Sequence, residues 1–256
     1  MRIVRVARPE GPAFGVVRDS EQGPVVALLE PHPFTDFALT GQVAPLDKVR
    51  LLAPVIPTKI LAIGKNYADH AAEMGGPVPA EPLVFAKLPT TVIGPGDAIV
   101  LPALSSEVHY EAELAIVIRH LARSIPVERA AEVMLGYTCA NDVTARDLQA
   151  ADGQWTRAKG FDTFCPLGPW IETDLDVSSV AVRCRVNGET RQDGDTRDLV
   201  FGVPQLVSYV SAFTTLLPGD VILTGTPAGV GPLRAGDEVE VEIGGIGVLR
   251  NPVRPE

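Results

Sequence analysis

Cysteine and histidine are scarce in this chain, and their scarcity excludes disulfide scaffolds and zinc clusters. The 256 residues include three cysteines and four scattered histidines, with no C-x-x-C pair and no H-E-x-x-H motif. An odd number of unpaired cysteines is typical of a reducing compartment, so we expect a cytoplasmic protein without disulfides. The cysteines expected to be buried thiols are Cys139, Cys165 and Cys184.

Several catalytic and nucleotide-binding motifs are also absent. The sequence contains no G-x-S-x-G, no G-x-G-x-x-G and no G-x-x-x-x-G-K-[ST]. The glycines of "LTGTPAGVG" follow an expected strand but open no helix, which argues against a phosphate-binding loop. This loop either presents the hydroxyls of Thr224 and Thr226 to a ligand or is an ordinary turn.

Positive charge is in short supply. Lysine and arginine number 22 against 32 aspartates and glutamates, and the formal net charge is −10. Nucleic acids and anionic membrane surfaces both attract basic patches, so we expect neither as a partner. A small anionic substrate remains compatible with this composition, because a few local cations can override the overall field.

The chain lacks a convincing transmembrane segment. The longest uncharged run, residues 199–219, has about the length of a membrane span but contains glycine, proline, glutamine, serine and threonine. We expect instead a helix from Pro204, spanning 204–216, with one apolar face against a core. The residues expected on that face are Leu206, Val207, Val210, Phe213 and Leu217.

The order of expected elements predicts a β-rich α+β fold. Strand-like stretches dominate, and they do not alternate regularly with helices, which excludes a doubly wound parallel sheet. The Asn187–Gly188 pair predicts a tight hairpin turn. A small all-β domain is expected over residues 1–56 and a larger domain over 57–256, joined by the proline-bounded "APVIPTK". The expected helices are 67–74, 126–134, 144–151 and 204–216.

Two carboxylates occupy the otherwise apolar stretch "VHYEAELAIVI", residues 108–118. Alternation along a single strand would place His109, Glu111 and Glu113 on one face. Both faces are otherwise apolar, so the strand is expected to be buried. Two buried carboxylates raise each other's pKa unless a positive charge lies between them. The pattern predicts either an acid/base pair or a nearby cation.

A histidine and a glutamate lie three residues apart on the helix expected at 67–74. His70 and Glu73 would share one helical face and could touch. A carboxylate that orients an imidazole produces a general base near neutral pH. The residues alone leave open the alternative of a solvated surface contact.

Further polar residues follow the apolar strand that ends near residue 141. Asp142 could supply chemistry or could cap the next helix, on which Arg146 and Gln149 lie one turn apart. Lys159 is an isolated lysine, and such lysines are usually solvated.

Together these motifs resemble the fumarylacetoacetate hydrolase superfamily. The resemblance runs from about residue 59 to residue 250 and implies the family's mixed β-sheet roll, a β-rich α+β fold. It also implies the small N-terminal β domain that precedes the catalytic domain in many bacterial members, and a homodimer. The matching segments are "GKNYADHAAEM", "HYEAELAIVI", "NDVTARDLQ", "WTRAKGFDTFCP", "NGETRQ" and "LTGTPAGVG".

The resemblance also implies roles for individual residues. The implied metal ligands are Glu111, Glu113 and Asp142, whose oxygen atoms suit Mg²⁺ or Mn²⁺, with Ca²⁺ as a substitute in crystals. His109 is expected to support these ligands. The implied catalytic residues are His70, Glu73 and Lys159. The implied substrate-binding residues are Arg146, Gln149, Thr226, Tyr67 and Lys87.

The implied reaction acts on a small anionic 2-oxo acid or its enol through a metal-stabilised enolate. Proton transfer alone gives isomerisation, loss of carbon dioxide gives decarboxylation, and water activated by His70 and Glu73 gives C–C hydrolysis. We favour an enzyme of the 2-hydroxyhepta-2,4-diene-1,7-dioate isomerase and 5-oxopent-3-ene-1,2,5-tricarboxylate decarboxylase type, in aromatic catabolism. The alternatives are an acylpyruvate (fumarylpyruvate-type) hydrolase, an oxaloacetate decarboxylase, or an inactive relative that only binds metal.

Overall fold

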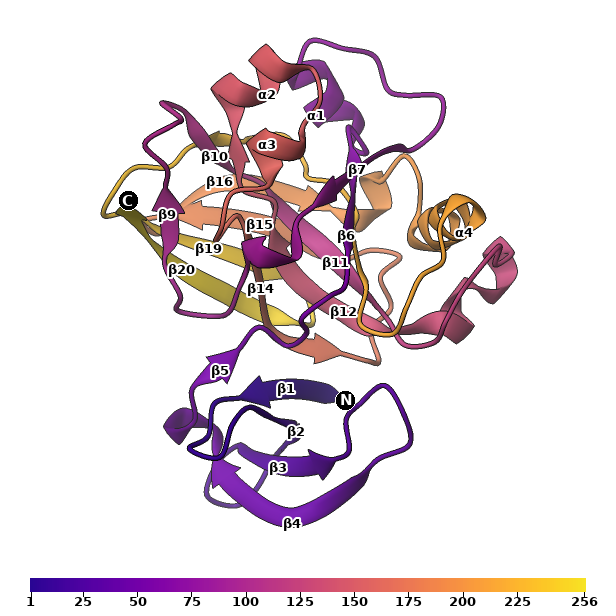
Figure 1. Cartoon of the computed structure of the whole chain (residues 1–256), viewed down its shortest axis with the longest axis vertical. Coiled ribbons are helices and arrows are strands. Elements are labelled where there is room, and N and C mark those ends of the chain that lie inside the picture. The colour runs from indigo at the N-terminus through magenta and orange to yellow at the C-terminus, as the bar shows by residue number, and fades with distance from the viewer.

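A small N-terminal unit of strands lies below a larger body in the computed structural model, which describes residues 1–256 (Figure 1). Valines and leucines on the inner face of these strands form a cluster of their own, with Val4, Val6, Val26 and Leu28 buried together. The strands pair antiparallel in the order β4-β3-β2-β1, and β5 pairs with β1. Their bounds are β1 (Arg2–Val6), β2 (Ala13–Arg18), β3 (Val25–Glu30), β4 (Ala38–Pro45) and β5 (Leu51–Leu52).

The N-terminal strands continue a sheet of the larger body. Strand β1 pairs antiparallel with β14, with Arg2 opposite Glu172 and Ile3 opposite Ile171. This twelve-stranded sheet runs β4-β3-β2-β1-β14-β12-β11-β17-β6-β7, with β8 paired to β14. It is mixed, because β17 and β6 are parallel whereas most other pairs are antiparallel. The remaining strands are β6 (Ile60–Gly64), β7 (Leu83–Lys87), β8 (Val92–Ile93), β11 (Ala112–Ile118), β12 (Met134–Asn141), β14 (Cys165–Glu172) and β17 (Val221–Leu223).

A five-stranded sheet and a three-stranded sheet complete the body. The order of the former is β16-β15-β19-β20-β9, and that of the latter is β13-β10-β18. The predicted hairpin is confirmed, since Asn187 and Gly188 have φ of 53° and 80° between β15 and β16. The bounds are β9 (Ile99–Leu101), β10 (Val108–Tyr110), β13 (Thr144–Ala145), β15 (Ala181–Val186), β16 (Glu189–Asp195), β18 (Gly231–Pro232), β19 (Glu238–Ile243) and β20 (Gly247–Pro255).

The main core lies between these sheets and confirms the predicted β-rich α+β fold. One face of β11 packs into a cluster of 33 buried residues that also includes residues of β15 and β19. The opposite face of β11 contributes Ala115 and Val117 to a second cluster, so the strand is buried on both sides. All three cysteines are buried and unpaired, as predicted.

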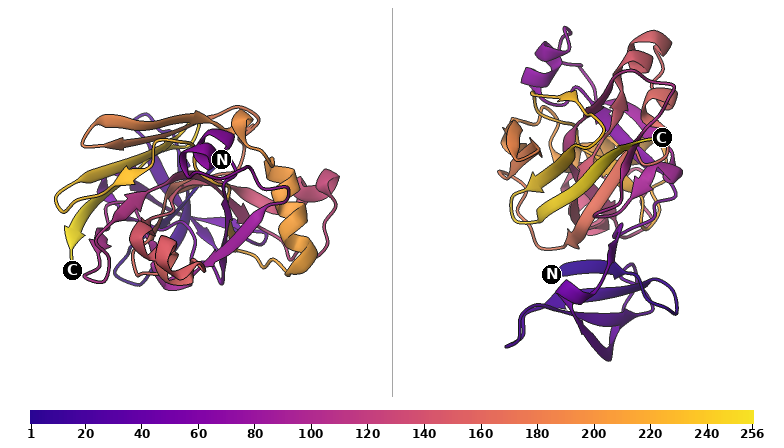
Figure 2. Two further views of the ribbon diagram at one scale, coloured as in Figure 1. Left: turned by 90° about the horizontal axis from the view of Figure 1, so that it is seen from above. Right: turned by 90° about the vertical axis from the view of Figure 1, so that its left-hand side faces the viewer.

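Helices are few. Helices α1 (Ala68–Glu73), α2 (Arg146–Asp152) and α3 (Thr156–Lys159) lie at the end of the body far from the N-terminal unit (Figures 1 and 2). The expected helix at 126–134 is instead a 3₁₀-helix, η3 (Val127–Val133), and α3 was not expected. No helix is long and apolar enough to cross a bilayer. The other short 3₁₀-helices are η1 (Leu46–Lys48), η2 (Pro89–Thr91) and η4 (Thr196–Asp198); the α-helices are α1 (Ala68–Glu73), α2 (Arg146–Asp152), α3 (Thr156–Lys159) and α4 (Val203–Phe213).

The predicted core face of the fourth helix is only partly correct. Leu206, Val207 and Val210 are fully buried, whereas Phe213 is 54% exposed and Leu217 is 37% exposed. Phe213 is the last residue of the helix and Thr214 is extended, so the helical spacing no longer sets the direction of Leu217.

The single strand expected at 108–118 is wrong, because the chain changes sheets at Glu111. Strand β10 pairs with β13 and β18, whereas β11 pairs with β12 and β17. His109 and Glu113 therefore belong to different sheets, and the alternation rule does not carry across the break. The amino-acid sequence of residues 108–118 gave no sign of this break.

Gly136 in β12 is a position where a side chain cannot fit. A Cβ there would lie 2.3 Å from the carbonyl oxygen of Glu172, whereas one at Gly41 would meet no atom within 4 Å. We predict that Gly136→Ala lowers the free energy of unfolding by about 3 kcal/mol or more. Gly41 also has a positive φ but no close neighbour, so Gly41→Ala should lower the free energy of unfolding by only about 1–2 kcal/mol. Urea unfolding measures both, and equal losses would contradict the clash.

Candidate active site

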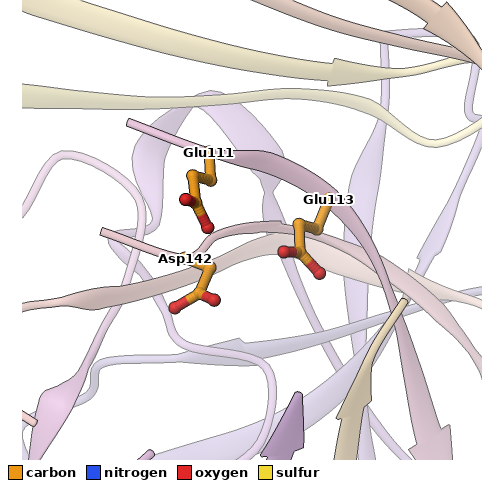
Figure 3. Close-up of side chains that lie close together, drawn as sticks. All are labelled: Glu111, Glu113 and Asp142. Atoms are coloured by element: carbon orange, nitrogen blue, oxygen red, sulfur yellow. The ribbon is translucent and has the colours of Figure 1, made fainter. Parts of the chain in front are cut away.

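Three carboxylates converge where two strands of the large sheet end. Glu113 lies in β11 and Asp142 directly follows β12, and the pairing of Ala112 with Asn141 makes these ends neighbours. The carboxylate oxygens of Glu111, Glu113 and Asp142 lie within 4.8 Å of one another, and all three residues are buried. Figure 3 shows the three side chains turned toward a common space.

Three buried or nearly buried cations neutralise two of these carboxylates. Lys159 Nζ lies 2.7 Å from Glu111 Oε2 and 2.7 Å from Asp142 Oδ2. Arg146 Nη2 lies 2.5 Å from Glu111 Oε1, and Lys87 Nζ lies 2.6 Å from Asp142 Oδ1. Burial alone would raise the pKa of Glu111, but Lys159 and Arg146 outweigh burial and hold this pKa well below its usual range.

Glu113 differs from the other two carboxylates because it has no ion-pair partner. Its one hydrogen bond comes from the backbone N–H of Gly225, 2.6 Å from Oε2. Burial, followed by the charges of Asp142 and Glu111, raises the pKa of Glu113 well above its ordinary value. A buried carboxylate that lacks an ion-pair partner can serve as a ligand of a bound cation. A set of ligands that are all oxygen atoms suits a hard divalent ion. The residues present therefore suit Mg²⁺ or Mn²⁺.

Two buried side-chain amides stabilise the break in the chain at Glu111. Asn141 Oδ1 accepts the backbone N–H of Glu111 at 2.9 Å, and Gln192 Oε1 accepts that of Ala112 at 2.9 Å. Gln192 Nε2 also donates to the hydroxyl of Thr226 at 2.7 Å. These bonds replace strand pairing at the point where the backbone leaves one sheet for another. Neither amide received a role from the sequence, although both lie in the motifs "NDVTARDLQ" and "NGETRQ".

The expected histidine–glutamate contact is present beside the carboxylates. His70 Nδ1 lies 3.0 Å from Glu73 Oε2, and His70 is 6% exposed, so the imidazole is buried although the side chain of Glu73 is 33% exposed. The carboxylate of Glu73 also accepts the backbone N–H of Gly229, at 3.1 Å and 3.3 Å from its two oxygens. The loop after β17 therefore holds Glu73, and Glu73 holds the imidazole.

These groups open on a cavity of about 290 Å³. Its apolar wall comprises Ile63, Met74, Phe85, Ala150 and Trp155. Arg146 and Gln149 are joined by a 2.7 Å hydrogen bond, and the hydroxyl of Thr226 donates to the carbonyl of Ala112 rather than pointing free. The predicted site residues that line the cavity are His70, Glu111, Glu113, Asp142, Arg146, Gln149, Lys159 and Thr226.

Four predicted residues do not line this cavity. Glu73 contacts it through His70, and Lys87 lies behind Asp142. Tyr67 is buried at the start of α1, and its hydroxyl has no hydrogen-bond partner. His109 Nε2 lies 2.9 Å from the exposed Glu107, and no hydrogen bond joins its ring to a predicted ligand.

The cavity also contains a lysine that the sequence reasoning missed. Lys65 lies between β6 and α1, lines the cavity and has a left-handed backbone with φ of 55°. Its place directly after the glycine that ends a strand, in "GKNYADH", was the available signal.

Comparison with known families identifies the family of this chain. A family model described as "Fumarylacetoacetate (FAA) hydrolase C-terminal" matches residues 59–254. The chain belongs to this family. A second model, "Rv2993c-like, N-terminal", matches residues 1–54 of this family member.

Several of the solved structures and curated proteins similar to this family member carry the names of enzymes. A structure named 5-carboxymethyl-2-hydroxymuconate delta-isomerase, from Mycobacterium smegmatis, is 51% identical with a TM-score of 0.94, and the match covers 100% of each chain. Maleylpyruvate hydrolase from Sphingobium, solved with manganese (II) ion and pyruvate, is 32% identical with a TM-score of 0.82, covering 100% of this chain and 99% of that one. The Bos taurus oxaloacetate tautomerase FAHD2A is 46% identical over 82% of this chain and 71% of its own length.

The two glutamates should respond oppositely to loss of charge in metal-free protein. Burial and the neighbouring carboxylates raise the pKa of Glu113, so at neutral pH Glu113→Gln, which cannot ionise, should raise the free energy of unfolding by about 1 kcal/mol or more. Glu111→Gln leaves Lys159 and Arg146 without a partner charge and should lower it by about 3 kcal/mol. Urea unfolding in EDTA measures both values. Changes of the same sign would contradict the charge distribution described above.

Gln192 offers a separate test of the amide network. Gln192→Leu preserves bulk but leaves the N–H of Ala112 without a partner, so it should cost about 1–3 kcal/mol of stability. Displacement of Glu111 and Glu113 should also weaken Mn²⁺ binding, measured by titration calorimetry. Gln22→Leu, at an exposed turn, is the control and should change neither quantity. Unchanged Mn²⁺ affinity in Gln192→Leu would show that the amide does not position the glutamates.

Proposed function

We propose that this protein is an isomerase that moves a proton within a small 2-oxo dicarboxylic acid or its enol. The reaction class is that of 2-hydroxyhepta-2,4-diene-1,7-dioate isomerase. The observation that carries this proposal is that the carboxylate cluster and His70 face one cavity, with Glu73 in contact with the imidazole from behind. A cation site and a proton-transfer group in the same cavity are the two components that enolate chemistry needs.

The ion is proposed to be Mg²⁺ or Mn²⁺, held by Glu111, Glu113 and Asp142. When bound, it would supply positive charge that stabilises an enolate oxygen. The manganese in the maleylpyruvate hydrolase structure supports this choice. Charge supports it as well, because Glu113 is the one carboxylate of the three that has no cationic partner.

Arg146 and Lys159 are proposed to bind and orient the substrate. Arg146 is 12% exposed in its side chain, and its other amino group is hydrogen-bonded to Gln149, so the guanidinium is fixed at the cavity wall. A planar guanidinium suits a carboxylate, and a fixed one loses little entropy on binding. Lys159 lies between Glu111 and Asp142, where its ammonium can also stabilise negative charge on a substrate oxygen.

His70 is proposed to carry the proton. With Nδ1–H donated to Glu73, the opposite nitrogen Nε2 is free to accept a proton from a substrate carbon or from its enol oxygen. Because Glu73 is itself held by the N–H of Gly229, the imidazole has a fixed direction. The carboxylate of Glu73 stabilises the imidazolium formed when the proton is accepted.

A second candidate is C–C hydrolysis, with His70 activating a water molecule instead of a substrate carbon. The partial burial of Glu73, which is 33% exposed in its side chain, leaves a route for water to this pair. The name of the maleylpyruvate hydrolase supports this candidate, but the Mycobacterium smegmatis structure and the Bos taurus protein, which are more identical to this chain, carry the names of an isomerase and a tautomerase.

Decarboxylation from the same enolate is a third candidate reaction. We also propose a role in aromatic catabolism, a cytoplasmic location and a homodimer.

A substrate panel tests this function directly. We expect turnover of 2-hydroxyhepta-2,4-diene-1,7-dioate or oxaloacetate with Mg²⁺ and none with EDTA. Nuclear magnetic resonance detects isomerisation, which leaves the mass unchanged, whereas mass spectrometry detects carbon dioxide loss or cleavage of acetylpyruvate. Activity that is indifferent to EDTA would contradict the metal-dependent mechanism.

Replacement of His70 separates proton transfer from metal binding. His70→Gln should lower kcat about 10²- to 10⁴-fold, the usual contribution of a general base. Mn²⁺ affinity should stay unchanged, because His70 makes no hydrogen bond to the three carboxylates. His120→Gln, at an exposed position, is the control. Equal loss of Mn²⁺ binding and activity would assign His70 to the metal site instead.

A further inference from the structure

Lys65 is the one cation lining the cavity that has no carboxylate partner. Arg146 is paired with Glu111, and Lys159 is paired with Glu111 and Asp142. Lys65 makes no ion pair and no side-chain hydrogen bond, although Lys65 is only partly exposed to solvent. An unpaired ammonium at the wall of a largely apolar cavity is available for an anionic ligand.

The backbone of Lys65 is held in a conformation that lysine disfavours. Its φ of 55° lies in the left-handed region, where glycine or asparagine would be adopted with less strain. The next residue enforces this turn, because the Asn66 side chain donates to the carbonyls of Phe201 and Thr224, at 3.1 Å and 2.8 Å. Asn66 Oδ1 also accepts the N–H of Phe201 at 2.9 Å. A strained lysine in a rigidly held turn points to a function for its side chain.

The chain around Lys65 leaves space for its ammonium. A Cβ added to Gly76 would lie 2.5 Å from Lys65 Nζ, so the side chain extends from the turn to the segment that follows α1. The same segment supplies His70 and Met74 to the cavity wall. The ammonium is therefore placed by α1 and its flanking turns, whereas the three carboxylates are placed by β11 and β12.

The charges in and behind the cavity indicate what this lysine binds. The carboxylates of Glu111, Glu113 and Asp142 are matched in number by the cations Lys87, Arg146 and Lys159. A divalent ion and Lys65 are then excess positive charge. A dicarboxylate neutralises more of this excess than a monocarboxylate does, and its second carboxylate needs a cation away from the metal end.

We propose that Lys65 binds the second carboxylate of the substrate and thereby makes the site selective for 2-oxo dicarboxylic acids over 2-oxo monocarboxylic acids. The inference rests on the proposed function for the orientation of the substrate, with its 2-oxo acid end at the carboxylate cluster. Lys65 is then a specificity-determining residue, distinct from the ligands and from the proton-transfer pair. The ion pair forms at the cavity wall, where low polarity strengthens it relative to a surface pair.

The test compares ligands that differ only in the second carboxylate. Oxaloacetate and 2-oxobutyrate serve as the kinetic pair. For each of them, the measured quantity is the rate at which the C3 protons exchange with solvent, after the uncatalysed rate is subtracted. L-malate and L-2-hydroxybutyrate serve as the unreactive pair, with binding to Mn²⁺-loaded protein measured by calorimetry. Lys65→Met should raise KM for oxaloacetate and Kd for L-malate about 10- to 100-fold, the range expected for a charge-assisted hydrogen bond. Values for both monocarboxylates should stay within about twofold, since their methyl group makes no ion pair.

Three further variants separate this role from a structural one. Lys65→Arg retains the charge and should recover most of the preference for dicarboxylates. Lys65→Gly relieves the left-handed strain, so its unfolding midpoint should be unchanged or higher while the preference is lost. Lys48→Met, at an exposed 3₁₀-helix, should leave the preference unaltered.

The outcomes distinguish this inference from the proposed function. If wild-type protein turns over oxaloacetate and Lys65→Met keeps the same ratio of dicarboxylate to monocarboxylate KM and Kd, the role of Lys65 is refuted and the function stands. If no 2-oxo acid is turned over but L-malate binds in a Lys65-dependent manner, the function is refuted and the subsite stands. Equal weakening of both members of each pair would also overturn the proposed selectivity.

Discussion

The balance of charge in one buried cluster is the constraint on which the rest of this structure depends. Three carboxylates cannot remain ionised side by side in the interior unless cations accompany them. Lys159 and Lys87 reach Asp142 from α3 and from the end of β7, so the cluster ties together elements far apart in the sequence. Lys87 also donates to the carbonyl of Lys159, at 2.7 Å. A helix of four residues has little stability of its own, and these buried contacts hold α3 in place.

Regular sheet pairing is interrupted where the chemistry is proposed to occur. At Glu111 the chain passes from one sheet to another, and side chains of Asn141 and Gln192 satisfy the backbone groups that strand pairing would otherwise satisfy. Such local departures from regular structure are expected at functional sites, where surrounding contacts compensate for them. The left-handed turn at Lys65, fixed by Asn66, is a second departure from regular structure, and it lies between β6 and α1.

An apolar wall gives these charges their strength. The rings of Phe85 and Trp155 meet edge to face with centroids 5.1 Å apart, and Lys159 Nζ lies 4.9 Å from the centre of the Phe85 ring. A Cβ at Gly64 would lie 2.8 Å from the Trp155 ring, so the tryptophan packs directly against the backbone that leads to Lys65. Exclusion of water by this wall lowers the local dielectric constant and strengthens every ion pair in the cavity.

The sequence by itself determined the β-rich class, the Asn187–Gly188 hairpin and the spacing that brings His70 against Glu73, because each depends on neighbours within a few residues. It also made the two glutamates conspicuous, although their ligand role came only from the family resemblance. Only the tertiary structure decided which carboxylates are paired, that Glu113 is not, and that His109 lies with Glu107. Those outcomes depend on contacts between segments such as residues 87, 142 and 159, which no local pattern encodes. The solvated lysine that residues alone predicted at position 159 is instead 2% exposed, because two carboxylates distant in sequence surround it.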